Sequence, residues 1–155
     1  RGQIASEILD ELEHRMLAYP YSGITLWTYE ALLKATLSAR QLNLRLVQIF
    51  ERTLHRPDIQ LNSDWREYGF RTLGFAYREL GQYKRAITYF HLAAQMKPLP
   101  DHYLVLAEMY AKIANITEAK RTLSALSAWN GLGDKELTRM RQIEASINSK
   151  TKDSQ

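Results

Sequence analysis

Histidine is the side chain of this sequence best suited to metal binding or proton transfer, because the chain contains no cysteine. The four histidines are His14, His55, His91 and His102. Two metal ligands on one helix usually lie three or four residues apart, so that both face the same side. No two of these histidines have that spacing. The sequence therefore predicts no metal site.

Other patterns that carry catalytic chemistry are also missing. The sequence has no glycine-rich phosphate loop, no nucleophile elbow and no His-Glu-x-x-His pattern. Asp10, Glu11 and Glu13 are clustered, but their spacing is typical of the solvated face of a helix. Asn115-Ile116-Thr117 matches a glycosylation sequon, and helix capping by Asn115 explains it more simply. We expect a protein that is not an enzyme and needs no cofactor.

The charge is mildly basic, with the two signs interleaved. Lys and Arg number 21 against 17 Asp and Glu, which gives a formal net charge of +4. The one local excess lies between positions 34 and 56, where five basic residues meet only Glu51. A nucleic-acid-binding surface usually clusters its basic residues more densely, so we do not expect nucleic acid as a partner. A solvated helix face is the simpler interpretation of this excess, and an acidic partner is the alternative.

The length of 155 residues predicts about one domain. No apolar run approaches the roughly 20 residues that a membrane-spanning helix needs, so we expect no membrane span. The first residue is Arg1 rather than Met, and we interpret the chain as a fragment or a processed form. We expect a cytoplasmic protein, and a periplasmic one stays open if an N-terminal signal or anchor was removed.

Helices must position whatever this chain binds, because its apolar residues recur at helical spacing almost throughout. No segment alternates with a period of two for long enough to predict a strand. Proline and glycine divide the pattern into eight helices, predicted at 3–18, 26–40, 42–56, 64–80, 83–97, 101–114, after Asn115, and at 134–149. The sequence thus predicts an all-α protein with a frayed tail at 150–155.

Several helix ends carry recognisable signals. Asp64 and Glu67 have the spacing of a capping box. Gly81 can adopt the left-handed conformation that often closes a helix. Asn115 and Asp134 can each cap the helix that follows.

The chain repeats itself with a period of 33 residues. Residues of similar size meet at this shift, in the pairs Phe70/Tyr103, Leu73/Leu106, Gly74/Ala107, Tyr77/Tyr110, Gly81/Ala114, Ala86/Ala119 and Phe90/Leu123. A small residue lets two helices approach, and a large one fills the space beside it. The recurrence therefore predicts helix pairs stacked on one another.

One unit resembles a tetratricopeptide (TPR) repeat. Its residues at the family's spacings are Leu73, Gly74, Tyr77, Gly81, Ala86, Phe90, Ala93 and Pro98. On this resemblance the chain is a single domain over 1–149, an α-α superhelix of about three TPR-like pairs at 26–57, 64–98 and 101–130. Helices 3–18 and 134–149 would cap its two ends.

The resemblance implies a concave groove that binds a peptide or protein segment. The residues expected to line it are Tyr68, Arg71, Thr72, Phe75, Arg78, Leu104, Glu108, Lys112, Ala31 and Ala35. Thr72 and Phe75 stand where some TPR proteins place the basic or amide residues of a carboxylate clamp, so that clamp is not supported. An alternative is that Tyr68 and Phe75 only cover the neighbouring helix.

The leading functional hypothesis is an adaptor or scaffold module for protein–protein interaction. A second is a chaperone similar to the small bacterial chaperones of secretion translocators, although those tend to be acidic. A third is a regulatory or sensor domain of a larger protein, such as a transcription regulator. Homodimer formation stays open, because Trp27, Trp65 and Trp129 lie near turns and exposed aromatic surface often marks an interface.

Overall fold

Seven helices and no strand occur in the part of the chain that the structure describes. The computed structural model describes residues 6–18, 31, 43–56, 61 and 63–152. The helices are α1 (Ser6–Ala18), α3 (Leu44–Leu54), α4 (Ser63–Glu79), α5 (Tyr83–Met96), α6 (Pro100–Lys112), α7 (Ile116–Ser127) and α8 (Asp134–Lys152). The prediction of an all-α protein is confirmed. The helix predicted at 26–40 lies outside the described residues, apart from Ala31, which is helical.

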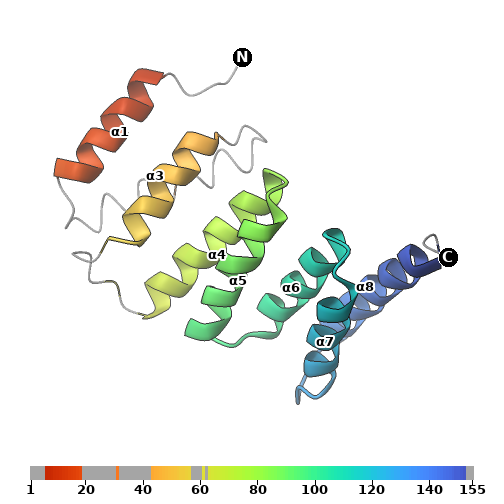
Figure 1. Ribbon diagram of the computed structural model, residues 1–155. Helices are drawn as coiled ribbons and strands as arrows, with labels where there is room; N and C mark the ends of the chain where they lie inside the picture. Colours follow the sequence, from red (N-terminus) through yellow and green to blue (C-terminus); the bar gives the residue numbers. More distant parts are fainter. Residues whose placement is uncertain (1–5, 19–30, 32–42, 57–60, 62, 153–155) are drawn as a thin grey trace.

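The helices follow one another along the molecule in chain order, from α1 at one end to α8 at the other (Figure 1). Contacts run between near neighbours: α1 packs on α3, α3 on α4, α4 on α5, and α5 on α6. The last three helices pack on one another in all three combinations. This neighbour-to-neighbour packing gives a fold like that of a helical-repeat protein.

The α4–α5 pair is close because a glycine faces an aromatic ring. A Cβ added to Gly74 would lie 2.8 Å from Cε2 of Phe90, so the approach depends on the missing side chain. The residues 33 positions later are Ala107 and Leu123, which are buried together in a separate cluster. The small residue predicted to lie against a large one is confirmed for Gly74 and Phe90.

The turns inside the two pairs have the same backbone geometry, 33 residues apart. Gly81 between α4 and α5 has a φ of +72°, as predicted, and Ala114 between α6 and α7 has a φ of +58°. In each turn the N–H of the next residue donates to the carbonyl oxygen five residues earlier, at 2.9 Å. This bond satisfies carbonyls that a helix end would otherwise leave free. The sequence repeat is therefore also a repeat of hydrogen bonding.

Helix α6 is buried on two faces. Its residues Val105, Leu106 and Met109 belong to a first core built with α1, α3, α4 and α5. Its residues Leu104, Ala107 and Ala111 belong to a second core built with α7 and α8. From α8 the second core takes Met140, Ile143 and Ile147. Helix α6 thus joins the two cores.

The helix ends agree with the sequence in part. Asn115 caps α7, since its side-chain oxygen accepts the N–H of Glu118 at 3.3 Å. The capping box at Asp64 and Glu67 is wrong, because α4 already begins at Ser63 and Glu67 turns inward to another partner. Helix α8 continues to Lys152, three residues beyond its predicted end.

Candidate functional site

Four of the residues predicted to bind a partner lie along one face of α4. They are Tyr68, Arg71, Phe75 and Arg78, called here the α4 stripe. Their spacings of three, four and three residues keep them within about one quarter of the helix circumference. All four side chains are half-buried, so each rests on the protein while keeping part of its surface in solvent.

Aromatic and cationic groups alternate along the stripe and stack in pairs. The guanidinium carbon of Arg71 lies 5.2 Å from the centre of the Tyr68 ring, and that of Arg78 lies 4.9 Å from the centre of the Phe75 ring. Both distances lie within the range of cation–π attraction, which contributes roughly 0.5–1 kcal/mol at an exposed site. These contacts restrain each guanidinium group beside an aromatic ring.

Phe75 also has a structural role. Its ring meets that of Phe90 edge to face, with 5.0 Å between the ring centres, and it packs against the first core. The expectation that Phe75 covers the neighbouring helix is therefore met on its inner side. Because the ring remains half-buried, its outer edge still belongs to the surface of α4.

A buried polar cluster lies beneath the stripe. Nε2 of His102 on α6 lies 2.9 Å from Oε1 of Glu67 on α4, and Nδ1 of the same ring lies 2.9 Å from the carbonyl oxygen of Lys97. A carbonyl only accepts hydrogen bonds, so Nδ1 of His102 carries a proton. A second proton must then lie between Nε2 and Glu67, either on the imidazole or on the carboxyl group. This contact between α4 and α6 could not be predicted from the sequence, because its two side chains are 35 residues apart.

Arg71 connects this cluster to the surface. Its Nε lies 3.0 Å from Oε1 of Glu67, which is within ion-pair distance. The alignment is nevertheless unsuitable for a hydrogen bond, and this buried Nε has no hydrogen-bond acceptor. Such groups are uncommon in folded proteins and carry a desolvation cost. Arg71 is thus held by its charge beside Glu67 and by its contact with the Tyr68 ring.

The other predicted groove residues lie in different surroundings. Leu104 is only 1% exposed and belongs to the second core, so it offers no surface to a partner. Thr72 is buried as well, and its hydroxyl donates to the carbonyl oxygen of Tyr68 at 2.9 Å. Glu108 accepts from Nη2 of Arg139 on α8 at 2.9 Å, which ties this part of α6 to the last helix.

The last three residues predicted to line the groove are Lys112, Ala31 and Ala35. Lys112 is exposed at the end of α6. Ala31 is exposed, and Ala35 lies outside the described residues. The structure therefore brings four of the five predicted α4 residues onto one face and buries Leu104 of α6, while Glu108 stays partly exposed and Lys112 exposed.

A second polar network, which the sequence did not reveal, joins α3 to the α4–α5 pair. Glu51 accepts hydrogen bonds from the hydroxyl of Tyr77 at 2.6 Å and from that of Tyr89. Nη1 of Arg85 donates to the Tyr77 hydroxyl at 3.0 Å. The Tyr89 hydroxyl uses its one proton on Glu51, so Nε2 of His55, 3.0 Å away, is the donor in that contact.

The tyrosines of this network resist ionisation. Burial, with help from the hydrogen bond to Glu51, raises the pKa of Tyr77 to about 12. The same causes, again with burial first, raise the pKa of Tyr89 as well. Both tyrosines remain neutral hydrogen-bond donors at physiological pH, which suits a structural joint between helices rather than proton transfer.

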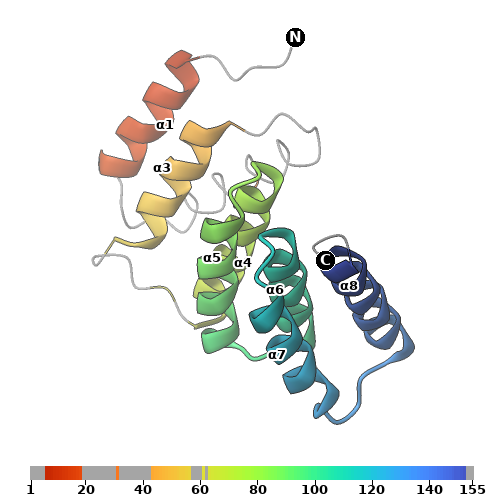
Figure 2. The ribbon, with the colours of Figure 1, turned by 45° about the vertical axis from the view of Figure 1, so that its right-hand side comes forward.

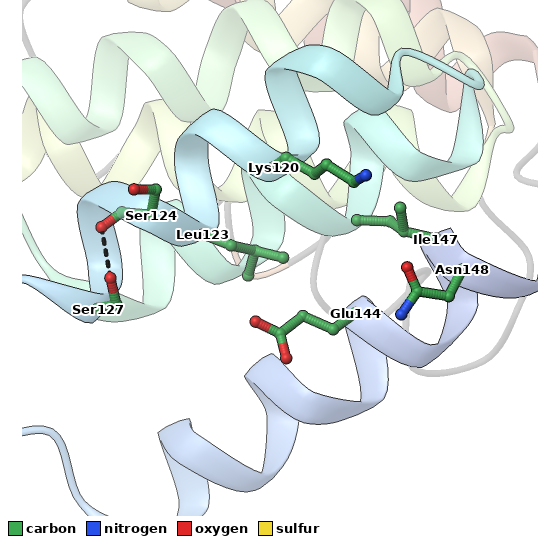
Figure 3. A pocket seen from close by; sticks show the side chains of 7 residues that line it. All are labelled: Lys120, Leu123, Ser124, Ser127, Glu144, Ile147 and Asn148. Atoms are coloured by element: carbon green, nitrogen blue, oxygen red, sulfur yellow. Dashed lines mark hydrogen bonds between the residues drawn. The ribbon is translucent and has the colours of Figure 1, made fainter. Parts of the chain in front are cut away.

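A pocket of about 420 Å³ lies between α7 and α8 (Figure 3). Its lining residues are Lys120, Leu123, Ser124 and Ser127 from α7, and Glu144, Ile147 and Asn148 from α8. Leu123 and Ile147 are buried and close its floor. The sequence did not predict this pocket, because the two sides are separated by a turn and by about 20 positions. Its rim presents one Lys and one Glu and no cluster of groups suited to catalysis.

Comparison with protein families and with curated proteins assigns no function to these sites. No protein-family model matches the chain, and no curated protein is significantly similar to it. Among the described residues, no group of three His, Cys, Asp or Glu side chains could hold a metal ion. None of the helices described is both long enough and apolar enough to cross a membrane. The class that the fold defines is an all-α protein like the helical-repeat proteins.

Proposed function

We propose that this protein is a non-catalytic interaction module whose helix pairs stack as a TPR-like superhelix. A segment of a partner protein would lie along the α4 stripe. The observation that carries the proposal is the alternation of two aromatic rings with two stacked guanidinium groups on one half-exposed helix face. Tyr and Arg are enriched among the residues that dominate binding energy at interfaces.

The chemistry of the stripe indicates the kind of segment it would take. Arg71 and Arg78 carry planar guanidinium groups of the kind that match a carboxylate, and that of Arg78 already donates to the neighbouring Glu79. Tyr68 and Phe75 offer flat apolar surface between these charges. The proposed ligand is therefore an extended or helical segment with acidic side chains interspersed with apolar ones.

Selection from a peptide library tests this proposal. Peptides are selected on the wild-type protein, and their affinities are then measured for the double variant Tyr68→Ala/Arg78→Glu. Both substituted side chains are half-exposed, so the fold should persist, and a thermal melt checks that it does. Phe75 is left intact because its loss would disturb the packing on Phe90.

The control is Arg121→Glu, which makes the same charge change at an 80% exposed position of α7. We expect the double variant to bind at least tenfold more weakly and the control to bind as the wild type does. Equal affinity for the double variant would remove the stripe from the binding site. Failure to select any peptide over a heat-denatured sample would contradict the binding function itself.

A further inference from the structure

Helix α1 lies alongside α3 in both views of the molecule (Figures 1 and 2). Nη2 of Arg45 lies 2.5 Å from Oδ1 of Asp10 and 2.9 Å from Oε2 of Glu13. Nη2 of Arg52 lies 2.5 Å from the other oxygen of Glu13. These two arginines belong to the basic excess that the sequence contains between positions 34 and 56. Their charge is thus met by acidic residues of the chain's own first helix.

Among the α1 side chains that the structure describes, two apolar ones pack into the core. Leu9 is the one α1 side chain described as fully buried, and Leu12 is partly buried against the first core. Ile8, next to Leu9, remains 52% exposed. On α3, Ile49 lies between Arg45 and Arg52 at spacings of four and three residues, so these three share one face. This face of α3, called here the α3 face, combines one buried apolar residue with two cations.

We propose that the α3 face is a docking surface for an acidic amphipathic helix of a partner protein, and that α1 occupies it within the free chain. A matching helix needs an apolar residue over Ile49 and carboxylates within reach of Arg45 and Arg52. Helix α1 has this pattern in Leu9, Asp10 and Glu13. The surface is separate from the α4 stripe, so this proposal does not depend on the function proposed above.

The attachment of α1 is of a kind that another helix can replace. Ion pairs between exposed side chains contribute little individually and are weakened by salt. An isolated helix of 13 residues is marginal in water, so α1 depends on its contacts with the rest of the protein, α3 among them, for its conformation. Because α1 is tethered, an incoming helix competes with a high effective concentration. Loosening α1 should therefore strengthen binding of a second acidic helix.

The experiment uses the full chain and two fluorescent peptides. One peptide has the sequence of residues 6–18, and the other is unrelated except that it keeps Leu at positions 9 and 12, Met at position 16 and acidic residues at positions 10 and 13. Fluorescence anisotropy measures their binding to the wild type and to the variant Leu9→Ala/Glu13→Ala, in which α1 is loosened and α3 is unchanged. We expect both peptides to bind this variant at least tenfold more tightly than the wild type.

A charge swap provides the matched control. In the variant Arg45→Glu/Arg52→Glu the acidic peptides should lose at least tenfold in affinity relative to the loosened variant. A peptide with lysines at positions 10 and 13 should bind that variant in their place. Equal binding of acidic and basic peptides to all three proteins would overturn the proposal. Binding of the 6–18 peptide alone, together with dimers of the loosened variant in light scattering, would identify a second copy of this chain as the occupant and would also overturn it.

Hydrogen exchange keeps the test decisive if a substituted protein does not fold. Raising the salt concentration around the wild type should speed amide exchange in α1 several-fold and leave α4 and α5 unchanged. In the same high-salt buffer, exchange in α1 should not depend on protein concentration. If exchange in α1 does not respond to salt, the ion pairs do not hold it and the proposal fails.

Discussion

At the scale of single residues, two turns with one geometry carry different side chains. Gly81 and Ala114 both have positive φ and lie 33 residues apart. An L-residue with a Cβ is disfavoured in this conformation by roughly 1–2 kcal/mol, whereas glycine adopts it freely. Ala114 is the one non-glycine residue with positive φ in the part of the chain described. The strain therefore lies in the second pair alone.

Exchanging the residues at these two turns should move stability in opposite directions. Glycine costs about 0.5–1 kcal/mol more backbone entropy on folding, so we expect Ala114→Gly to stabilise the protein by about 0.5 kcal/mol. Gly81→Ala should destabilise it by a similar amount. Nothing lies within 4 Å of a Cβ added to Gly81, so sterics against other residues do not interfere. Urea unfolding measures both, and a destabilising Ala114→Gly would contradict the argument.

At the scale of the elements, the network around Glu51 makes the contact between α3 and the α4–α5 pair sensitive to alkaline pH. The pKa of Tyr77 is raised above its ordinary value of 10.0 to about 12, so the folded state favours the protonated hydroxyl. The resulting stabilisation is complete below pH 10 and is lost as pH rises towards 12. We expect the free energy of unfolding to fall over this range, and less steeply in Tyr77→Phe. Tyr83→Phe, which alters a hydroxyl outside the network, should retain the fall of the wild type; an unchanged slope in Tyr77→Phe would refute this origin.

The hydrogen bond between α4 and α6 depends on one proton that lies between Glu67 and His102. Glu67→Ala leaves a buried imidazole nitrogen without a partner, and we expect a loss of about 3 kcal/mol. Glu67→Gln should cost clearly less, because the amide N–H can donate to Nε2 of a neutral His102. Chemical denaturation compares the two with Glu79→Gln, a control at an exposed position of the same helix. Equal losses for Ala and Gln would show that the hydrogen bond is not what matters.

These contacts between helices are also the features that could not be predicted from the sequence. Gly81 and Asn115 could be placed correctly because turn and cap signals act over a few residues. Glu67 was misassigned because its spacing from Asp64 fits a cap equally well, while its actual partner lies 35 residues away. Leu104 has the repeat position of a surface residue but is buried in the second core, to which α8 contributes. Local chemistry could be read from the chain, and contacts between distant helices could not.

For the molecule as a whole, packing predicts an order of local opening. Helices α4, α5 and α6 carry many buried side chains and have packed neighbours on more than one side. Helix α1 has one fully buried side chain among those described. We expect amide exchange to be slowest in α4–α6 and fastest in α1, because local opening costs least where few apolar contacts are lost. Exchange in α1 as slow as in α4 would contradict this order.

The two apolar faces of α6 also determine where a further helix pair could be added to this protein. An internal helix must present one apolar face to each neighbour, as α6 does, whereas the buried side chains of α8 belong to one core, which among the described residues it shares with α6 and α7. A copy of residues 100–132 inserted just before α8 would supply a helix with two such faces and its partner. The same copy attached after α8 would meet a helix whose far side is largely polar. A helix pair inserted before α8 is therefore expected to pack into the fold, and the same pair attached after α8 is not.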